Sequence, residues 1–214
     1  MTTSHGRFIL FLLLASFLIN TNTQASKADS LRQVLSKNIA DTTRVSVLNA
    51  LSKAYCNDNP DTAVTIGLSS KELAEKIKFK PGLALALKQI GIAYYLKGEY
   101  IDAVNHWQQA LEVYKSIGDK VGVANMLSNQ GAVYFNQGDD AKSLELHLQS
   151  LKMSEDVNDT LRIVTSLANI GSIYLNKPAT YKKAIDNFLK AYTMAKIINN
   201  QYMIGTSSVN LGEI

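Results

Sequence analysis

The chain has 214 residues, of which 46% are hydrophobic and 19% are charged, and its formal net charge at pH 7 is +4. This length suits one ordinary domain or a short repeat array. The basic residues are scattered and form no basic run, so the composition argues against a nucleic-acid-binding protein.

Residues 1–25 are predicted to be a secretory signal peptide. Arg7 precedes an uncharged apolar stretch, residues 8–19, which is shorter than the roughly 20 residues of a bilayer span but suits the apolar part of a signal. A polar segment follows and ends at Ala25, where we place the cleavage site. We therefore expect export to the periplasm or another extracytoplasmic space. The alternative is a membrane-anchored or buried first helix.

The single cysteine, Cys56, cannot form a disulfide within the chain. The stability of an exported chain would then come from packing alone. We interpret Cys56 as a small apolar side chain on a helix and not as a reactive thiol.

The rest of the chain is predicted to be wholly helical. Residues 26–40 are expected to form an N-terminal capping helix, and residues 41–214 a helical array. Apolar residues fall at helical spacing, and turn sequences recur after about every twenty residues, which predicts helices of roughly 14 to 18 residues. Four aspartates at the starts of these helices are predicted to cap them: Asp61, Asp119, Asp139 and Asp159.

Small residues and rings recur with a period of about 40 residues. Gly91, Gly131 and Gly171 are each followed three residues later by a tyrosine. The second half of each copy has a small residue, a ring and another small residue. These are Ala103, Trp107 and Ala110, then Ser143, His147 and Ser150, then Ala184, Phe188 and Ala191. A weaker first copy has Ser52, Tyr55, Ala63, Gly67 and Ser70. Because Gly67 occupies the ring position, we expect the loosest packing there.

Alternation of small and large residues suits antiparallel helix pairs that pack on themselves and on the next pair. The pattern resembles the tetratricopeptide repeat over about residues 41–214. This resemblance implies an all-α fold, a right-handed α-solenoid of about four antiparallel helix hairpins. The last copy, at Gly212, is expected to be truncated.

No catalytic motif accompanies the repeats. The three histidines, His5, His106 and His147, lack metal-ligand spacing, and no phosphate-binding glycine loop or nucleophile motif occurs. We therefore expect no enzymatic activity in this chain, no metal and no cofactor.

A row of amide side chains is the main candidate site. The residues two before each repeat glycine are Gln89, Asn129, Asn169 and Asn210. In the solenoid they would line the concave groove, where amides can bind the backbone of an extended peptide. Other groove candidates are Lys88, Asn125, Ser128, Thr165 and Ser172, with Tyr95 and Phe135 for apolar contacts. The alternative is that the amides only bind neighbouring helix groups or water. Because the candidates are mostly uncharged, a clamp for an acidic chain end is not expected.

The first functional hypothesis is an exported, non-enzymatic module that binds a peptide or protein segment. The second is the N-terminal sensory region of a membrane-bound bacterial histidine kinase or nucleotide cyclase, because the exported 40-residue repeats resemble those of such proteins. In that case the chain would continue through its open C-terminal end into a membrane domain. Self-association through the same end is a third possibility.

Overall fold

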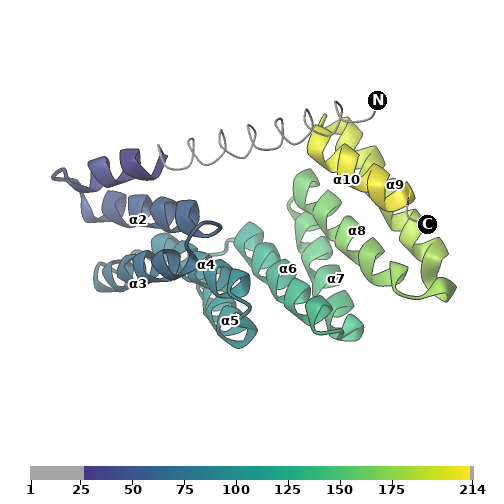
Figure 1. The fold of residues 1–214 in the computed structure, drawn as a ribbon, viewed down its shortest axis with the longest axis horizontal. Helices are drawn as coiled ribbons and strands as arrows, with labels where there is room; N and C mark the ends of the chain where they lie inside the picture. Colours follow the sequence, from purple (N-terminus) through teal and green to yellow (C-terminus); the bar gives the residue numbers. More distant parts are fainter. Residues whose placement is uncertain (1–26, 213–214) are drawn as a thin grey trace, which may run out of the picture. The chain divides into compact units, whose positions relative to one another are not determined.

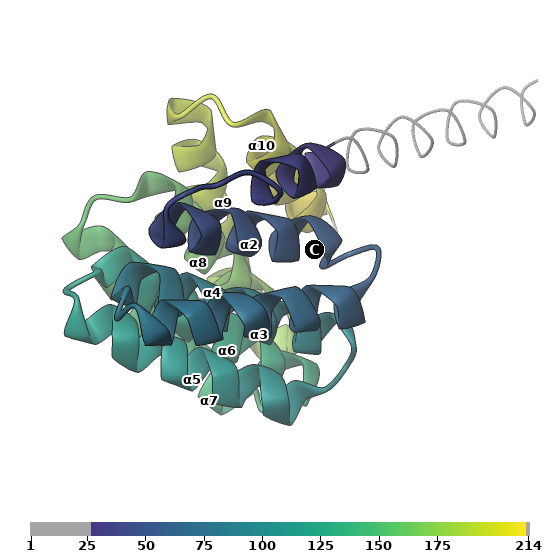
Figure 2. The same ribbon diagram turned by 90° about the vertical axis from the view of Figure 1, so that its left-hand side faces the viewer.

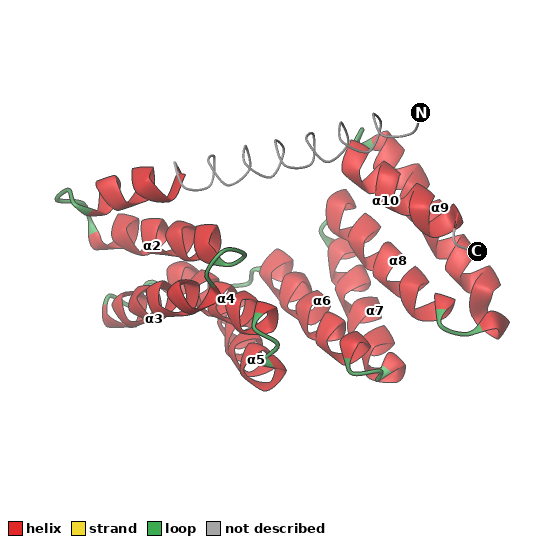
Figure 3. Ribbon diagram, in the orientation of Figure 1, coloured by secondary structure: helices red, strands yellow, loops and turns green. Residues whose placement is uncertain are grey.

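The structure, a computed structural model, describes residues 27–212. The predicted signal peptide and the first residue of the predicted capping helix lie outside this range. The described part consists of helices and short connections, without a strand (Figure 3). Residues 27–35 are helical. The helices that follow are α2 (Asp41–Tyr55), α3 (Pro60–Lys76), α4 (Lys80–Leu96), α5 (Tyr100–Ser116), α6 (Lys120–Asn136), α7 (Asp140–Asp156), α8 (Thr160–Leu175), α9 (Tyr181–Ile197) and α10 (Gln201–Gly212), with the short 3-10 helix η1 (Pro178–Thr180) before α9.

The chain divides into two compact units, with the boundary between Glu99 and Tyr100. In the first unit, α2, α3 and α4 pack against one another (Figure 2). In the second unit, each helix from α5 to α10 packs against the next one along the chain (Figure 1). The predicted all-α fold of stacked helix pairs is confirmed.

Local capping determines where most helices begin. The predicted caps Asp119, Asp139 and Asp159 each accept a hydrogen bond from the backbone amide three residues later, at 2.8 to 3.1 Å. The prediction for Asp61 is wrong, because the side chain of Asn59 caps α3 instead. Pro60 takes the first helical position, which suits its fixed φ. The N-cap is therefore the residue before it, Asn59, and not Asp61.

A common turn ends successive helices. Gly98, Gly118 and Gly138 have φ values of 72° to 78°, and Lys78 and Asn158 take the same left-handed conformation twenty residues before and after them. In each turn the amide of the next residue donates to the carbonyl five residues back, at 2.8 to 3.0 Å. These bonds satisfy carbonyls that the helix end leaves unpaired. The same turn therefore recurs every twenty residues from Lys78 to Asn158.

In the second unit, a glycine of one helix faces a ring of its partner helix in the pairs α6–α7 and α8–α9. A Cβ atom added to Gly131 would lie 2.8 Å from Nε2 of His147, and one added to Gly171 would lie 2.6 Å from Cε1 of Phe188. Both rings are buried. The predicted role of these glycines as points of close helix contact is confirmed.

Gly67 does not leave the loose packing that was expected. A Cβ at this position would lie 2.6 Å from Cγ1 of Ile90, which belongs to α4. The prediction is wrong because the missing ring of α3 is replaced by a side chain from the next helix. Ile90 of α4 therefore fills the space beside Gly67 that a ring on α3 would otherwise fill.

We expect Gly131→Leu to destabilise the second unit by about 2 kcal/mol, because the added side chain overlaps His147 and the helices cannot close. Urea unfolding followed by circular dichroism measures the change. Gly205→Leu is the matched control, since Gly205 is also helical but has no atom within 4 Å of its Cβ position. Equal stability of the two variants would contradict the role assigned to Gly131.

His147 makes the second unit sensitive to acid. Its side chain is 2% exposed, and its Nδ1 has no hydrogen-bond partner among the described residues. Burial lowers the pKa of His147 from its usual 6.5 to about 4. The unfolded chain therefore binds a proton more readily than the folded chain. Stability is fully present above pH 6.5 and is lost as the pH falls towards 4.

We expect His147→Phe to remove this pH dependence, because phenylalanine cannot be protonated and the next repeat already places Phe188 against a glycine. Between pH 7 and pH 5 the wild-type chain should lose roughly 2 kcal/mol more unfolding free energy than the variant. Urea titrations of both proteins at the two pH values test this. Parallel losses in the two proteins would show that His147 is not the responsible group.

Candidate functional site

A small polar pocket lies in the second unit. Its volume is about 120 Å³. Four uncharged side chains that the sequence placed in the groove line it: Asn125, Ser128 and Asn129 from α6 and Thr165 from α8. Ser128 and Asn129 follow Asn125 by three and four positions, so both share a helix face with Asn125. All four are half-buried and reach the surface.

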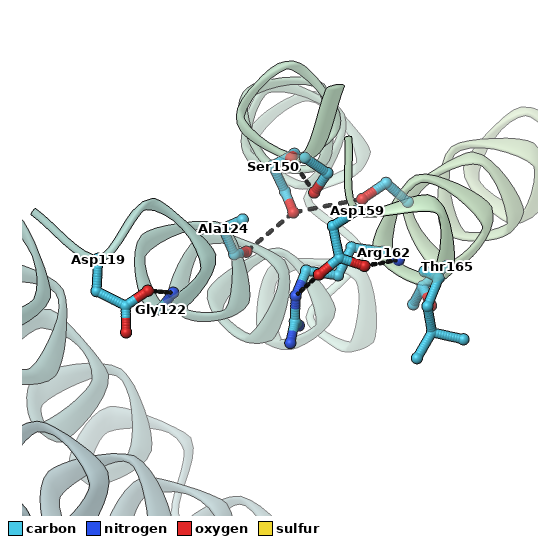
Figure 4. A network of polar contacts seen from close by, with 10 residues as sticks. Asp119, Gly122, Ala124, Ser150, Asp159, Arg162 and Thr165 are labelled. Atoms are coloured by element: carbon cyan, nitrogen blue, oxygen red, sulfur yellow. Dashed lines mark hydrogen bonds and ion pairs between the residues drawn. The ribbon is translucent and has the colours of Figure 1, made fainter. Parts of the chain in front are cut away.

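Two buried hydroxyl groups also line the pocket. Ser150 donates a hydrogen bond to the carbonyl of Ala124 at 2.9 Å, and its Oγ lies 3.3 Å from that of Ser166 (Figure 4). In the repeat pattern Ser150 is equivalent to Ala110 and Ala191. A hydroxyl thus replaces a methyl group beside this pocket.

Arg162, in the first turn of α8, supplies the only charged side chain among the residues that line the pocket. Its Nε lies 2.8 Å from Oδ2 of Asp159, in an ion pair whose geometry is poor for a hydrogen bond (Figure 4). The other oxygen of Asp159 accepts from the backbone amide of Arg162. Asp159 therefore caps the start of α8 and also pairs with the Nε atom of Arg162.

The charge of Arg162 also acts on Tyr114 at the end of α5. The pKa of Tyr114 is raised to about 12, mainly by burial and also by Asp119, whereas Arg162 opposes the shift. A cation lowers the pKa of a phenol only when it is near enough for its field to be felt. Arg162 is therefore near enough to Tyr114 for its charge to act on the phenol.

The other groove candidates are more dispersed. Asn169 and Asn210 are half-buried on α8 and α10 and do not line the pocket. Gln89 is 4% exposed, and its Oε1 has no partner among the described residues, so its side chain belongs to the core of the first unit. The remaining candidates are half-buried: Lys88, Tyr95, Phe135 and Ser172.

Sequence reasoning missed Arg162, although the repeat carries a signal for it. The 40-residue spacing makes Arg162 equivalent to Gly82 and Gly122. A Cβ at Gly122 would overlap the ring of Tyr114. In the next repeat the large and the small residue change places. Ser154 stands at the position of Tyr114, and Arg162 stands at the position of Gly122. The exchange leaves room for a long side chain beside the pocket.

A larger pocket of about 650 Å³, which the sequence did not predict, is formed by α7, α8 and α9. Apolar residues contribute much of its lining: Leu151, Ile163, Leu167, Leu189 and Met194. All of these except Leu189 belong to, or pack against, one hydrophobic core cluster. Polar residues line the other half: Glu155, Asn158, Asn187, Lys190 and Thr193. The smaller pocket is the stronger candidate for a peptide backbone, because its lining consists mainly of amide and hydroxyl side chains and includes the predicted groove residues.

Reactive groups are scarce in the described range. Residues 27–212 contain no group of three or more His, Cys, Asp or Glu side chains that could hold a metal ion. None of the helices described is long and apolar enough to cross a membrane. Cys56 is buried, and burial raises its pKa to about 11, so its thiol is protonated at neutral pH.

Comparison with family models gives two matches, both described as tetratricopeptide repeat, over residues 83–117 and 122–197. No curated protein sequence matches the chain.

Similar solved structures include a Rap protein complexed with Competence and Sporulation Factor, with a TM-score of 0.78 and 13% identity over 90% of this chain and 55% of that one. Aspartyl phosphate phosphatase F from Bacillus subtilis has a TM-score of 0.76 and 13% identity over 82% of this chain and 46% of that one. A signal transduction ATPase of the STAND type from Pyrococcus horikoshii, which has a tetratricopeptide repeat sensor, has a TM-score of 0.74 and 19% identity over 92% of this chain and 31% of that one.

At these identities the likeness concerns the fold alone, and this chain spans only about a third to just over half of each of the three proteins. The family matches are more specific. They cover just over half of the chain and include the close glycine–ring contacts of Gly131 and Gly171. The chain belongs to the tetratricopeptide repeat family.

Proposed function

We propose that this protein is a non-enzymatic interaction module that binds an extended segment of a partner protein along α6 and α8. The polar pocket carries this proposal, because it gathers amide and hydroxyl side chains at the surface of two successive repeats. Such groups can bind a peptide backbone without requiring a particular sequence.

The amide groups suit this role chemically. An asparagine side chain both donates and accepts, as each peptide unit of an extended chain does. Asn129 and Asn169 occupy equivalent positions in successive repeats, and both are half-buried. Packing against neighbours limits their motion before binding, which reduces the entropy lost when a ligand is held.

The comparisons support the class of function. The Rap protein with a similar fold was solved in complex with Competence and Sporulation Factor. By analogy, the repeats of this chain would serve as a binding surface. The apolar stretch at residues 8–19 supports an extracytoplasmic location for that surface.

A second candidate function is the sensory region of a larger membrane-bound signalling protein. The similarity to a signal transduction ATPase with a tetratricopeptide repeat sensor favours it, since this chain spans 31% of that protein. The two candidates differ in attachment. Native protein recovered with membranes supports the sensory region, and native protein released by osmotic shock supports the free module.

We expect the double variant Asn129→Ala and Asn169→Ala to bind a captured segment at least tenfold more weakly. Each lost amide removes hydrogen bonds worth about 1 kcal/mol. A peptide selected on the wild-type chain from a displayed random library serves as the ligand, and calorimetry measures both affinities.

Asn105→Ala is the matched control, because Asn105 is exposed on α5 and does not line the pocket. The far-ultraviolet circular dichroism of all variants should stay unchanged. If the double variant binds the peptide as tightly as the control does, the proposed role of the amides is wrong.

A further inference from the structure

We propose that the polar pocket selects a carboxylate group of the bound segment through the guanidinium of Arg162. This inference rests on the proposed function and assigns a chemical preference to one part of the same site. It departs from the sequence-based expectation that the groove has no clamp for an acidic chain end, because Arg162 was not among the expected groove residues.

The lining of the pocket is positively charged. Arg162 contributes a cation, and the other lining side chains carry amides, hydroxyls or a methyl group, with no carboxylate among them. Asp159 neutralises Arg162 only from the Nε side, at 2.8 Å. The two terminal nitrogens of the guanidinium have no hydrogen-bond partner among the described residues. Two parallel N–H groups are the geometry that binds a carboxylate through both of its oxygens.

Neutral donors stand beside the guanidinium. Asn125, Ser128 and Asn129 line the same pocket and make no hydrogen bond within the described part of the chain. Thr165 is different, because its hydroxyl already donates to the carbonyl of Leu161 at 2.9 Å. The two amides and Ser128 can therefore donate to an anionic oxygen that Arg162 holds.

The size and charge of the pocket favour a carboxylate over a phosphate. The pocket has a volume of only about 120 Å³, which suits one short side chain or the end of a chain. One cation that is partly offset by Asp159 balances at most a single negative charge. A phosphate group carries nearly two negative charges at neutral pH.

The preference is confined to one place in the array. The positions equivalent to Arg162 are Gly82, Gly122 and Met203, none of which has a charge. A single acidic group would thus fix the register of the bound segment along the groove. The amide groups of the other repeats would bind its backbone whatever its sequence.

The test uses the full chain labelled with ¹⁵N and three short peptides of glycine, alanine and serine. The first has a central aspartate and both ends blocked. The second has asparagine in place of the aspartate, and the third has no acidic side chain but a free C-terminal carboxylate. Amide shifts of α6 and α8 report binding in each titration.

We expect the aspartate peptide to bind about fivefold more tightly than the asparagine peptide, a modest ratio because Arg162 is partly exposed. Arg162→Gln should reduce this ratio to about one, and Arg162→Lys should give an intermediate ratio. Arg32→Gln is the matched control, since Arg32 also pairs with an aspartate three residues before it, Asp29. The control should keep the wild-type ratio. The spectra of the free variants establish that each is folded.

Tighter binding of the third peptide than of the first would support the proposal and identify a chain end as the source of the carboxylate. Equal binding of all three peptides, or a preference that Arg162→Gln leaves unchanged, would overturn the proposal while the peptide groove stands. If no peptide shifts the amides of α6 and α8, the proposed function is overturned as well.

Discussion

The close approach of paired helices at glycine is the constraint on which the array in the second unit depends. At Gly131 and Gly171 a Cβ atom would come within 3.0 Å of the ring on the facing helix, so any larger residue must push the pair apart. The ring itself can change, because His147 and Phe188 occupy equivalent positions. The constraint is therefore one of space, and the chemistry of the residue that fills the space varies from repeat to repeat.

At each of these contacts a large side chain faces a small residue, and the large side chain can come from either helix. Ile90 fills the space above Gly67 where the other repeats place a ring on the second helix. The contact between Gly122 and Tyr114 becomes Arg162 and Ser154 one repeat later, with the large and small partners exchanged. Such exchanges pair a large residue with a small one, which avoids both a cavity and overpacking. They also allow a charged side chain to reach a surface that is neutral in the other repeats.

This also explains how far the sequence predicts the structure. Helix starts and ends depend on residues within one turn, such as Asp119 or Gly138, and these were readable. The error at Asp61 was local too, since Pro60 outweighed a good capping residue. The packing at Gly67 was not readable, because Ile90 is 23 residues away in the sequence. The α6 side of the pocket followed from the repeat pattern and its resemblance to the tetratricopeptide repeat. Arg162 did not, because its place in the pocket depends on the packing of three helices.

Polar departures from the repeat have different energetic consequences inside and outside the core. At the centre of the α6–α7 contact, Ser143 and His147 leave Oγ and Nδ1 buried without partners in the described structure, and each such atom costs about 1 to 3 kcal/mol. At the pocket, the buried hydroxyl of Ser150 donates to the carbonyl of Ala124, and the buried Nε of Arg162, which makes no hydrogen bond, is offset by the charge of Asp159 at 2.8 Å. Polar groups can therefore accumulate at the pocket with little loss of stability. The cost of burying polar groups without partners therefore favours a binding site at the surface of the helix stack over one in its core.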